Sequence, residues 1–149
     1  MDDVVELSPD ECRELLGRDV VGRVAFTTPR GPRIVPVNYT VGADAVAIRT
    51  TAYSELATYA PGTSVAFEID HLDRALGRGW SVIVLGHCER GPDQAVVGAG
   101  TGERAESPEP WAGGHRTLLL RISLDEVTGR RVGGDRWPHP VVAQSERRD

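Results

Sequence analysis

The chain contains no lysine, and arginine supplies all 17 of its basic residues. This absence excludes a lysine Schiff base and the lysine-containing phosphate loop of many nucleotide hydrolases. Cysteine is also scarce, because only Cys12 and Cys88 are present, and two are too few for a disulfide framework. The first residues are acidic, whereas a secretory signal begins with positive charge. We therefore expect a protein of the reducing cytoplasm.

Long apolar runs are missing as well, since the longest, residues 82–85, is far too short for a transmembrane helix. Positive charge is in deficit: 17 basic residues face 22 acidic ones, and the formal net charge is −5. This balance argues against binding to nucleic acid or to an anionic membrane. With 149 residues, of which 40% are hydrophobic, the chain has the size and composition of one folded domain.

Two short helices are predicted from their capping residues. The first spans residues 7–17, where Ser8 is the N-cap and Glu11 completes a capping box after a proline at the first helical position. The second spans residues 54–60, with Ser54 as the N-cap and a Pro-Gly pair after the last turn.

β-Branched and alternating apolar residues predict a set of strands. Residues 20–28 and 33–41 form a hairpin around a Pro-Arg-Gly-Pro turn, and Pro36 predicts that the sheet opens in the second strand. The near-continuous apolar segment 80–88 predicts a central strand buried on both faces, after a loop at 71–79. The other predicted strands are residues 45–51, 64–70, 117–122 and 127–132.

The predicted fold class is mainly β, of the α+β type. About six closely spaced strands with two short flanking helices favour a closed or partly closed antiparallel barrel over a sheet with helical crossovers. We expect one domain over residues 1–132, with a Gly- and Pro-rich surface excursion at 89–114 that contains a short helix near 93–97. Residues 133–149 are predicted to form a flexible C-terminal tail.

The segment 48–54 collects groups that bind phosphate. A strand ends near Arg49, and the hydroxyls of Thr50 and Thr51 follow it. Ser54 then opens a helix, whose first N–H groups add further donors. The alternative interpretation is structural: Arg49 is a solvated edge residue, the threonines are strand formers, and Ser54 is only a cap.

The run Val35-Pro36-Val37-Asn38 carries groups suited to the edge of a planar ligand. The proline frees main-chain N–H and C=O groups from sheet pairing, and Asn38 adds an amide donor and acceptor. The alternative is a simple edge strand in which the proline blocks aggregation.

Trp80 begins an aliphatic strand, next to Ser81, in a chain with only 5% aromatic residues. A glycine before it permits a close approach to the backbone. The indole either forms a wall for an aromatic ligand or covers the end of a barrel core, and the composition does not separate the two.

No metal site and no catalytic side chain are predicted. His87 and Cys88 are neighbours on a strand and face opposite sides, so they do not form a metal site by themselves. The sequence also has no nucleophile elbow and no Walker or dinucleotide-binding glycine pattern.

Taken in order, these segments resemble the flavin-binding split-barrel family related to pyridoxamine 5′-phosphate oxidase. The resemblance covers most of the span from residue 7 to residue 132. It rests on five stretches in the expected order and spacing: residues 21–25, 32–39, 48–51, 65–70 and 79–86.

The resemblance implies a six-stranded split barrel that forms a homodimer and holds two FMN molecules at the subunit interface. It assigns three groups of residues: Arg49, Thr50, Thr51 and Ser54 to the phosphate; Val35, Pro36, Val37 and Asn38 to the isoalloxazine edge; and Trp80 and Ser81 of the partner subunit to the same cofactor.

One departure from the family pattern concerns charge. Many members carry a lysine shortly after the arginine of the phosphate segment, whereas this chain has Glu55 near that place. Tight phosphate binding then requires another arginine, such as Arg23 or Arg33, to compensate. The tail has no clear match to the substrate-binding segment of the true oxidases, so their substrate is not implied.

The leading functional hypothesis is a flavin-dependent oxidoreductase that passes a hydride or electrons to a small planar substrate, with no catalytic side chain of its own. One alternative is a reductase that uses the deazaflavin F420, which relatives with this fold also bind. The other is a non-catalytic module that binds flavin or haem for sensing or storage.

Overall fold

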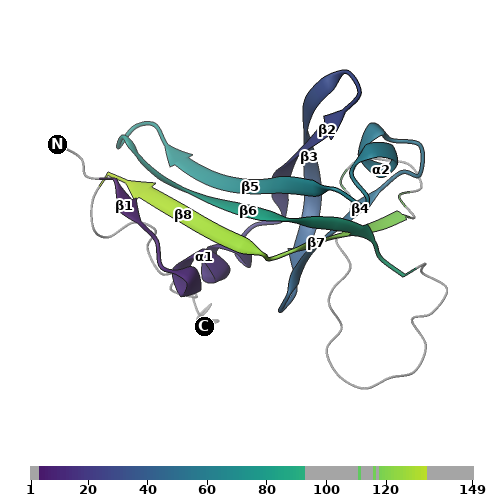
Figure 1. Ribbon diagram of the computed structural model, residues 1–149. Helices are drawn as coiled ribbons and strands as arrows, with labels where there is room; N and C mark the ends of the chain where they lie inside the picture. Colours follow the sequence, from purple (N-terminus) through teal and green to yellow (C-terminus); the bar gives the residue numbers. More distant parts are fainter. Residues whose placement is uncertain (1–3, 93–110, 112–115, 117, 134–149) are drawn as a thin grey trace, which may run out of the picture.

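The structure is a computed structural model that describes residues 4–92, 111, 116 and 118–133 (Figure 1). Its first helix, α1 (Pro9–Leu16), begins as predicted. The Ser8 hydroxyl accepts a hydrogen bond from the Glu11 N–H at 3.2 Å, and the Glu11 carboxylate accepts one from the Ser8 N–H at 2.7 Å. This capping box fixes the start of a helix whose inner side chains are buried. Those side chains are Cys12, Leu15 and Leu16.

Six strands close into an antiparallel barrel, which confirms the predicted fold class. Their order around the barrel is β2-β3-β4-β7-β6-β5, and β5 pairs back onto β2. The helix α2 (Glu55–Tyr59), capped by Ser54 as predicted, connects β4 to β5. The barrel strands are β2 (Val21–Thr28), β3 (Gly31–Val41), β4 (Ala45–Thr50), β5 (Ser64–Asp73), β6 (Arg78–Arg90) and β7 (Leu118–Ser123).

The long strand β6 belongs both to the barrel and to an extension of the sheet. Its end pairs with β7, whereas residues 79–85 pair with β8 (Glu126–Val132), onto which β1 (Val5–Glu6) is added. The two pairings part at Gly86, where a Cβ atom would lie 1.8 Å from the Ser123 carbonyl oxygen. Because no side chain fits at that distance, glycine is required at this position, where β6 changes its pairing partner from β8 to β7.

The barrel core is tied to α1 by one tyrosine. Tyr39 packs edge-on against Phe67, with 4.8 Å between the ring centroids. Its hydroxyl donates a 2.6 Å hydrogen bond to the carbonyl oxygen of Leu16, at the end of α1. Burial raises the pKa of Tyr39 above its ordinary value, so the phenol keeps the proton that this bond needs.

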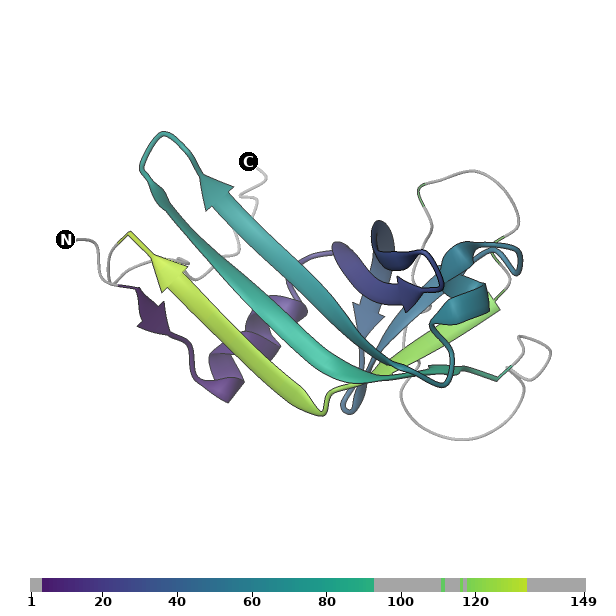
Figure 2. The ribbon, with the colours of Figure 1, turned by 45° about the horizontal axis from the view of Figure 1, so that its top comes forward.

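Only one of the two faces of the sheet built from β5, β6 and β8 is covered by a described helix. Helix α1 packs against one face (Figure 2). No described helix covers the opposite face, which we call the open face. Cross-strand pairing places its apolar residues in neighbouring rows: Ala25, Ile34, Ala66, Ile83 and Leu85. The open face is therefore a partly apolar surface that the described part of the chain leaves exposed.

Two predictions for β5 and β6 are wrong. The segment 71–79, predicted as a loop, is mostly strand, because β5 continues to Asp73, which pairs with Arg78 at the start of β6. The strand predicted to be buried on both faces is buried on one only, since Ile83 and Leu85 remain 41% and 44% exposed. The physical reason is that the barrel wall is one layer thick here, and the alternate side chains of β6 lie on the open face.

Some predictions fall outside the described residues. These are the short helix near 93–97, most of the excursion at 89–114, and the predicted tail beyond residue 133. The short strand β1 was not predicted, because two residues carry no period. Neither described helix is long and apolar enough to cross a membrane.

Candidate functional site

The sheet opens along strand β3 near Pro36, as the sequence predicts. It pairs with β2 along its length, from Gly31 to Asn38, but with β4 only through residues 39–41. Within the described residues, the β3 edge at Pro36 therefore has no strand beside it. Backbone groups of an unpaired edge are free of the ladder and can bind a ligand.

A pocket lies between this edge and β4. Tyr39 pairs with Ile48 and both are buried, so the residues next to them, Asn38 and Arg49, belong to the outward rows. They line a cavity of about 190 Å³. The structure thus brings together four of the predicted ligand-binding residues, Pro36, Val37, Asn38 and Arg49. The described residues of the lining are Val21, Pro36, Val37, Asn38, Arg49, Trp111 and Arg116. Val35 packs against the core instead.

Two of these residues, Trp111 and Arg116, were missed by the sequence reasoning. Both lie in or just after the Gly- and Pro-rich excursion, which has no period to read. The backbone N–H of Trp111 donates a 2.8 Å hydrogen bond to Oδ1 of Asn38. Its indole is 74% exposed. The only available signal was a tryptophan in a chain that has three, placed in a polar segment.

The predicted phosphate hydroxyls make bonds within the protein. The Ser54 hydroxyl accepts from the Ala57 N–H and donates to the Thr51 carbonyl oxygen, each at 3.0 Å. A hydroxyl has one proton, so in its 2.9 Å contact with Thr50 the threonine is the donor. These bonds fasten the end of β4 to α2, as the structural interpretation of this segment requires. Binding of a phosphate by Thr50, Thr51 and Ser54 stays a prediction.

Trp80 and Ser81 lie on β6, away from the pocket lining of the same chain. Trp80 is 7% exposed, belongs to the core cluster, and stacks on His71 with 6.2 Å between ring centroids. Ser81 is half-buried and pairs across the sheet with Asp70 and Arg130. Their predicted contact is with a cofactor held by another subunit, and it stays a prediction.

Two arginines near the site differ in their partners. Arg33 forms an ion pair with Glu55, with 3.4 Å between Nε and Oε2. Arg23 pairs with Glu68 at 3.0 Å and with Asp70 at 3.4 Å, on the open face. Burial raises the pKa of Glu68, and the neighbouring Asp70 carboxylate adds to the increase.

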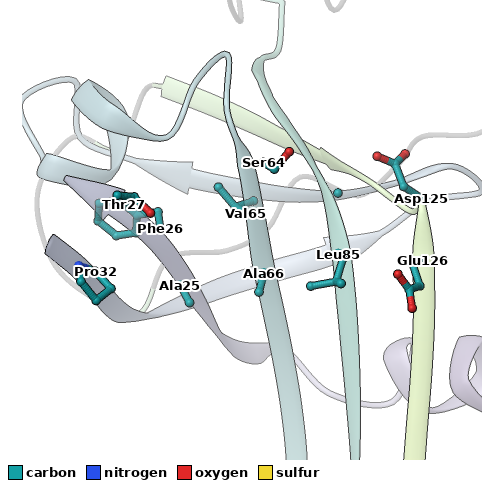
Figure 3. A pocket seen from close by; sticks show the side chains of 11 residues that line it. Ala25, Phe26, Thr27, Pro32, Ser64, Val65, Ala66, Leu85, Asp125 and Glu126 are labelled. Carbon is teal, nitrogen blue, oxygen red and sulfur yellow. The ribbon is translucent and has the colours of Figure 1, made fainter. Parts of the chain in front are cut away.

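A larger cavity lies elsewhere, at one end of the open face (Figure 3). It measures about 600 Å³. Figure 3 shows Ala25, Ala66, Leu85 and Glu126 in a row across neighbouring strands. The charged residues of the lining are Asp125 and Glu126, and no basic residue is among them. A phosphate would therefore be repelled here, and the smaller cavity with two arginines suits an anion better.

No group of three metal-ligating side chains occurs among the residues that the structure describes. Cys88 is buried, and burial raises its pKa to about 11, so its thiol is protonated and unreactive at neutral pH. His87 is exposed on the other side of the strand, as the alternation predicts.

The structure is a closed antiparallel barrel in which one strand edge is open, next to a pocket lined by two arginines. This arrangement is that of a small split-barrel protein. A family model described as pyridoxamine 5′-phosphate oxidase matches residues 8–131. The chain belongs to this family.

Three relatives illustrate the similarity. The uncharacterized protein Rv0080 of Mycobacterium tuberculosis is 35% identical over 138 residues, which cover 89% of this chain and 88% of that protein. The solved FAD binding protein from Mycobacterium smegmatis is 30% identical, with a TM-score of 0.66, over 87% of this chain and 98% of its own. An FAD-binding protein from Mesorhizobium loti shares the fold at 21% identity, with a TM-score of 0.68, over 90% and 100% of the two chains.

Proposed function

We propose that this protein is an FMN-binding flavoprotein that acts as an oxidoreductase on a small molecule. The observation that carries the proposal is the pocket in which the opened edge of β3, with Pro36, Val37 and Asn38, meets Arg49 of β4. Membership of the family and the relative at 30% identity, an FAD binding protein, support a flavin cofactor. The proposed compartment is the cytoplasm, in keeping with two free buried cysteines.

The residues of the pocket fit a flavin. Val21 and Pro36 offer an apolar surface to a planar ring, and Asn38 offers an amide to its polar edge. Arg49 offers a guanidinium to the phosphate. When bound, the flavin supplies the hydride or electron transfer, and the protein binds it, orients it and leaves one ring face open to the substrate.

The proposal includes a homodimer. A cavity of about 190 Å³ is smaller than the roughly 300–1,000 Å³ of usual ligand sites, so one chain provides only part of the pocket that a flavin needs. The open face offers apolar surface for a second copy, with Ile34 66% exposed. In such a dimer, Trp80 and Ser81 of the partner subunit would complete the site.

The cofactor is tested on the protein as purified from its producing cells. We expect a visible spectrum with the two long-wavelength bands of a flavin, and FMN as the mass of the released molecule. A single band at shorter wavelength, with the mass of F420, would contradict the choice of FMN. A bound flavin that is neither reduced by NAD(P)H nor reoxidised by any acceptor would instead support a sensing or storage module.

The phosphate assignment is tested by Arg49→Ala. Loss of a hydrogen bond to a charged group should weaken FMN binding by about 1.5–3 kcal/mol without unfolding the barrel, because Arg49 lies outside the core. Affinity is measured by fluorescence titration of the apoprotein, and folding by circular dichroism. Unchanged affinity would contradict the role of Arg49.

A further inference from the structure

The phosphate end of the proposed site has a charge problem. Glu55 is the first residue of α2, immediately after Ser54, and a carboxylate there opposes a phosphate. Arg33 neutralises it through their 3.4 Å ion pair. That contact uses Arg33 to cancel a negative charge rather than to add a positive one. Arg23, the other compensating residue expected from the sequence, bonds to Glu68 and Asp70 on the open face.

Arg116 is placed to supply the missing charge. It is half-buried and lies two residues before β7. The register of β7 sets Leu118 opposite Thr50, so Arg116 approaches the end of β4 that carries the predicted phosphate residues. It lines the same pocket as Arg49, and neither Arg33 nor Arg23 is among the described residues of that lining.

From this arrangement we infer that Arg116 is a phosphate-binding residue of the flavin site, acting with Arg49 as a pair of guanidinium groups around one anion. The inference rests on the proposed function and extends it to a residue outside the sequence motif. Two guanidinium groups offer a dianion several charge-assisted hydrogen bonds in fixed geometry. Arg33 has a positioning role, because it holds the carboxylate of Glu55.

The test compares FMN with riboflavin, which has the same ring and lacks the phosphate. Binding of both to wild-type apoprotein and to Arg116→Ala is measured by fluorescence titration. Loss of a charge-assisted bond should weaken FMN binding by about tenfold or more and change riboflavin binding by less than about twofold. Arg116→Gln, which keeps most of the aliphatic stem and a polar end without the charge, should give the same pattern if Arg116→Ala is unstable.

Arg121→Ala provides the matched control. It removes the same charge from β7, but Arg121 pairs with exposed Asp44 and lines a different cavity. We expect it to leave both affinities unchanged. The FMN affinity of Arg116→Ala should also depend less on salt than that of wild type, since one fewer charge contact is screened.

The outcomes separate the two proposals. Wild-type protein that binds neither FMN nor riboflavin overturns the proposed function, and this inference with it. Wild-type protein that binds both, with an FMN-to-riboflavin ratio that Arg116→Ala and Arg116→Gln leave unchanged, overturns the inference alone. Equal weakening of both ligands also overturns it, because Arg116 would then contact the ring.

Discussion

The amide of Asn38 is oriented by two backbone groups. Its Oδ1 accepts from the Trp111 N–H at 2.8 Å, and its Nδ2 donates to the Val20 carbonyl oxygen at 3.4 Å. A flipped amide would place a donor against the N–H and an acceptor against the carbonyl, so these partners fix which atom is nitrogen. Nδ2 carries a second proton, which suits a carbonyl oxygen on the ligand.

Asn38→Asp should therefore weaken flavin binding. The substitution keeps the shape of the side chain but replaces the donor with an anionic oxygen, which faces the Val20 carbonyl and the polar edge of the ring. We expect a loss of about tenfold for riboflavin, because Asn38 contacts the ring, and at least as large a loss for FMN, because the new carboxylate also opposes the phosphate. Fluorescence titration of both ligands provides the measurement, and a loss confined to FMN would refute this placement of Asn38.

Some residues of the site are predictable from their neighbours in the sequence, and others are not. Asn38 and Arg49 are predictable from local patterns in the sequence. Asn38 lies close after the proline that opens its strand, and Arg49 is the basic residue near the end of its strand. Trp111 and Arg116 do not, since the Trp111 contact with Asn38 spans 73 residues of chain. The excursion has no hydrophobic period, so nothing local indicates which of its side chains returns to the barrel.

Among the elements, β6 depends most on one residue. Gly86 lies where β7 gives way to β8, and the Ser123 carbonyl oxygen occupies the space of a side chain. Alanine at this position has to displace backbone of the neighbouring strand, and backbone cannot rotate away as a side chain can.

Gly86→Ala should lower the free energy of unfolding by about 2 kcal/mol or more, the cost of overpacking against a fixed backbone. Gly42→Ala is the matched control, because its Cβ would meet only the Ala45 carbonyl oxygen at an ordinary 3.7 Å. We expect the control to change stability by less than about 0.5 kcal/mol. Urea unfolding followed by circular dichroism measures both, and equal stability of the two variants would argue against the steric account.

Elements with local signals were predicted well. The capping box at Ser8, the N-cap at Ser54 and the turn before Gly31 depend on contacts between residues that are close in sequence. The β5–β6 hairpin was misjudged because polar residues such as Asp73 and Arg78 resemble a loop, although they pair across the strands. The exposure of Ile83 and Leu85 depends on what covers the sheet, which a periodic pattern does not record.

At the scale of the whole molecule, the open face is the surface proposed to bind a second copy. Leu85 lies in the row at the cavity end of this face, between Ala66 and Glu126, and is 44% exposed. A charge at this position would have to lose its water when two copies associate, which costs free energy even beside the Glu126 carboxylate.

Leu85→Lys should therefore give a folded monomer with weakened FMN binding, because the site would lose the partner's contribution. Leu76→Lys is the control, since Leu76 is also exposed, at 61%, but lies in the turn between β5 and β6. Light scattering with and without FMN determines the mass of each variant. A Leu85→Lys protein that remains dimeric would show that the copies associate through another surface.

The division of β6 between two sheets has a consequence for how the molecule can be cut. One part of β6 belongs to the barrel, and the other part belongs to the sheet against which α1 packs. Neither part of the strand therefore keeps all of its hydrogen-bonding partners without the other. Cleavage or truncation near Gly86 would leave two fragments that each lack half of a sheet. We therefore expect the described part of the chain to unfold as one cooperative unit.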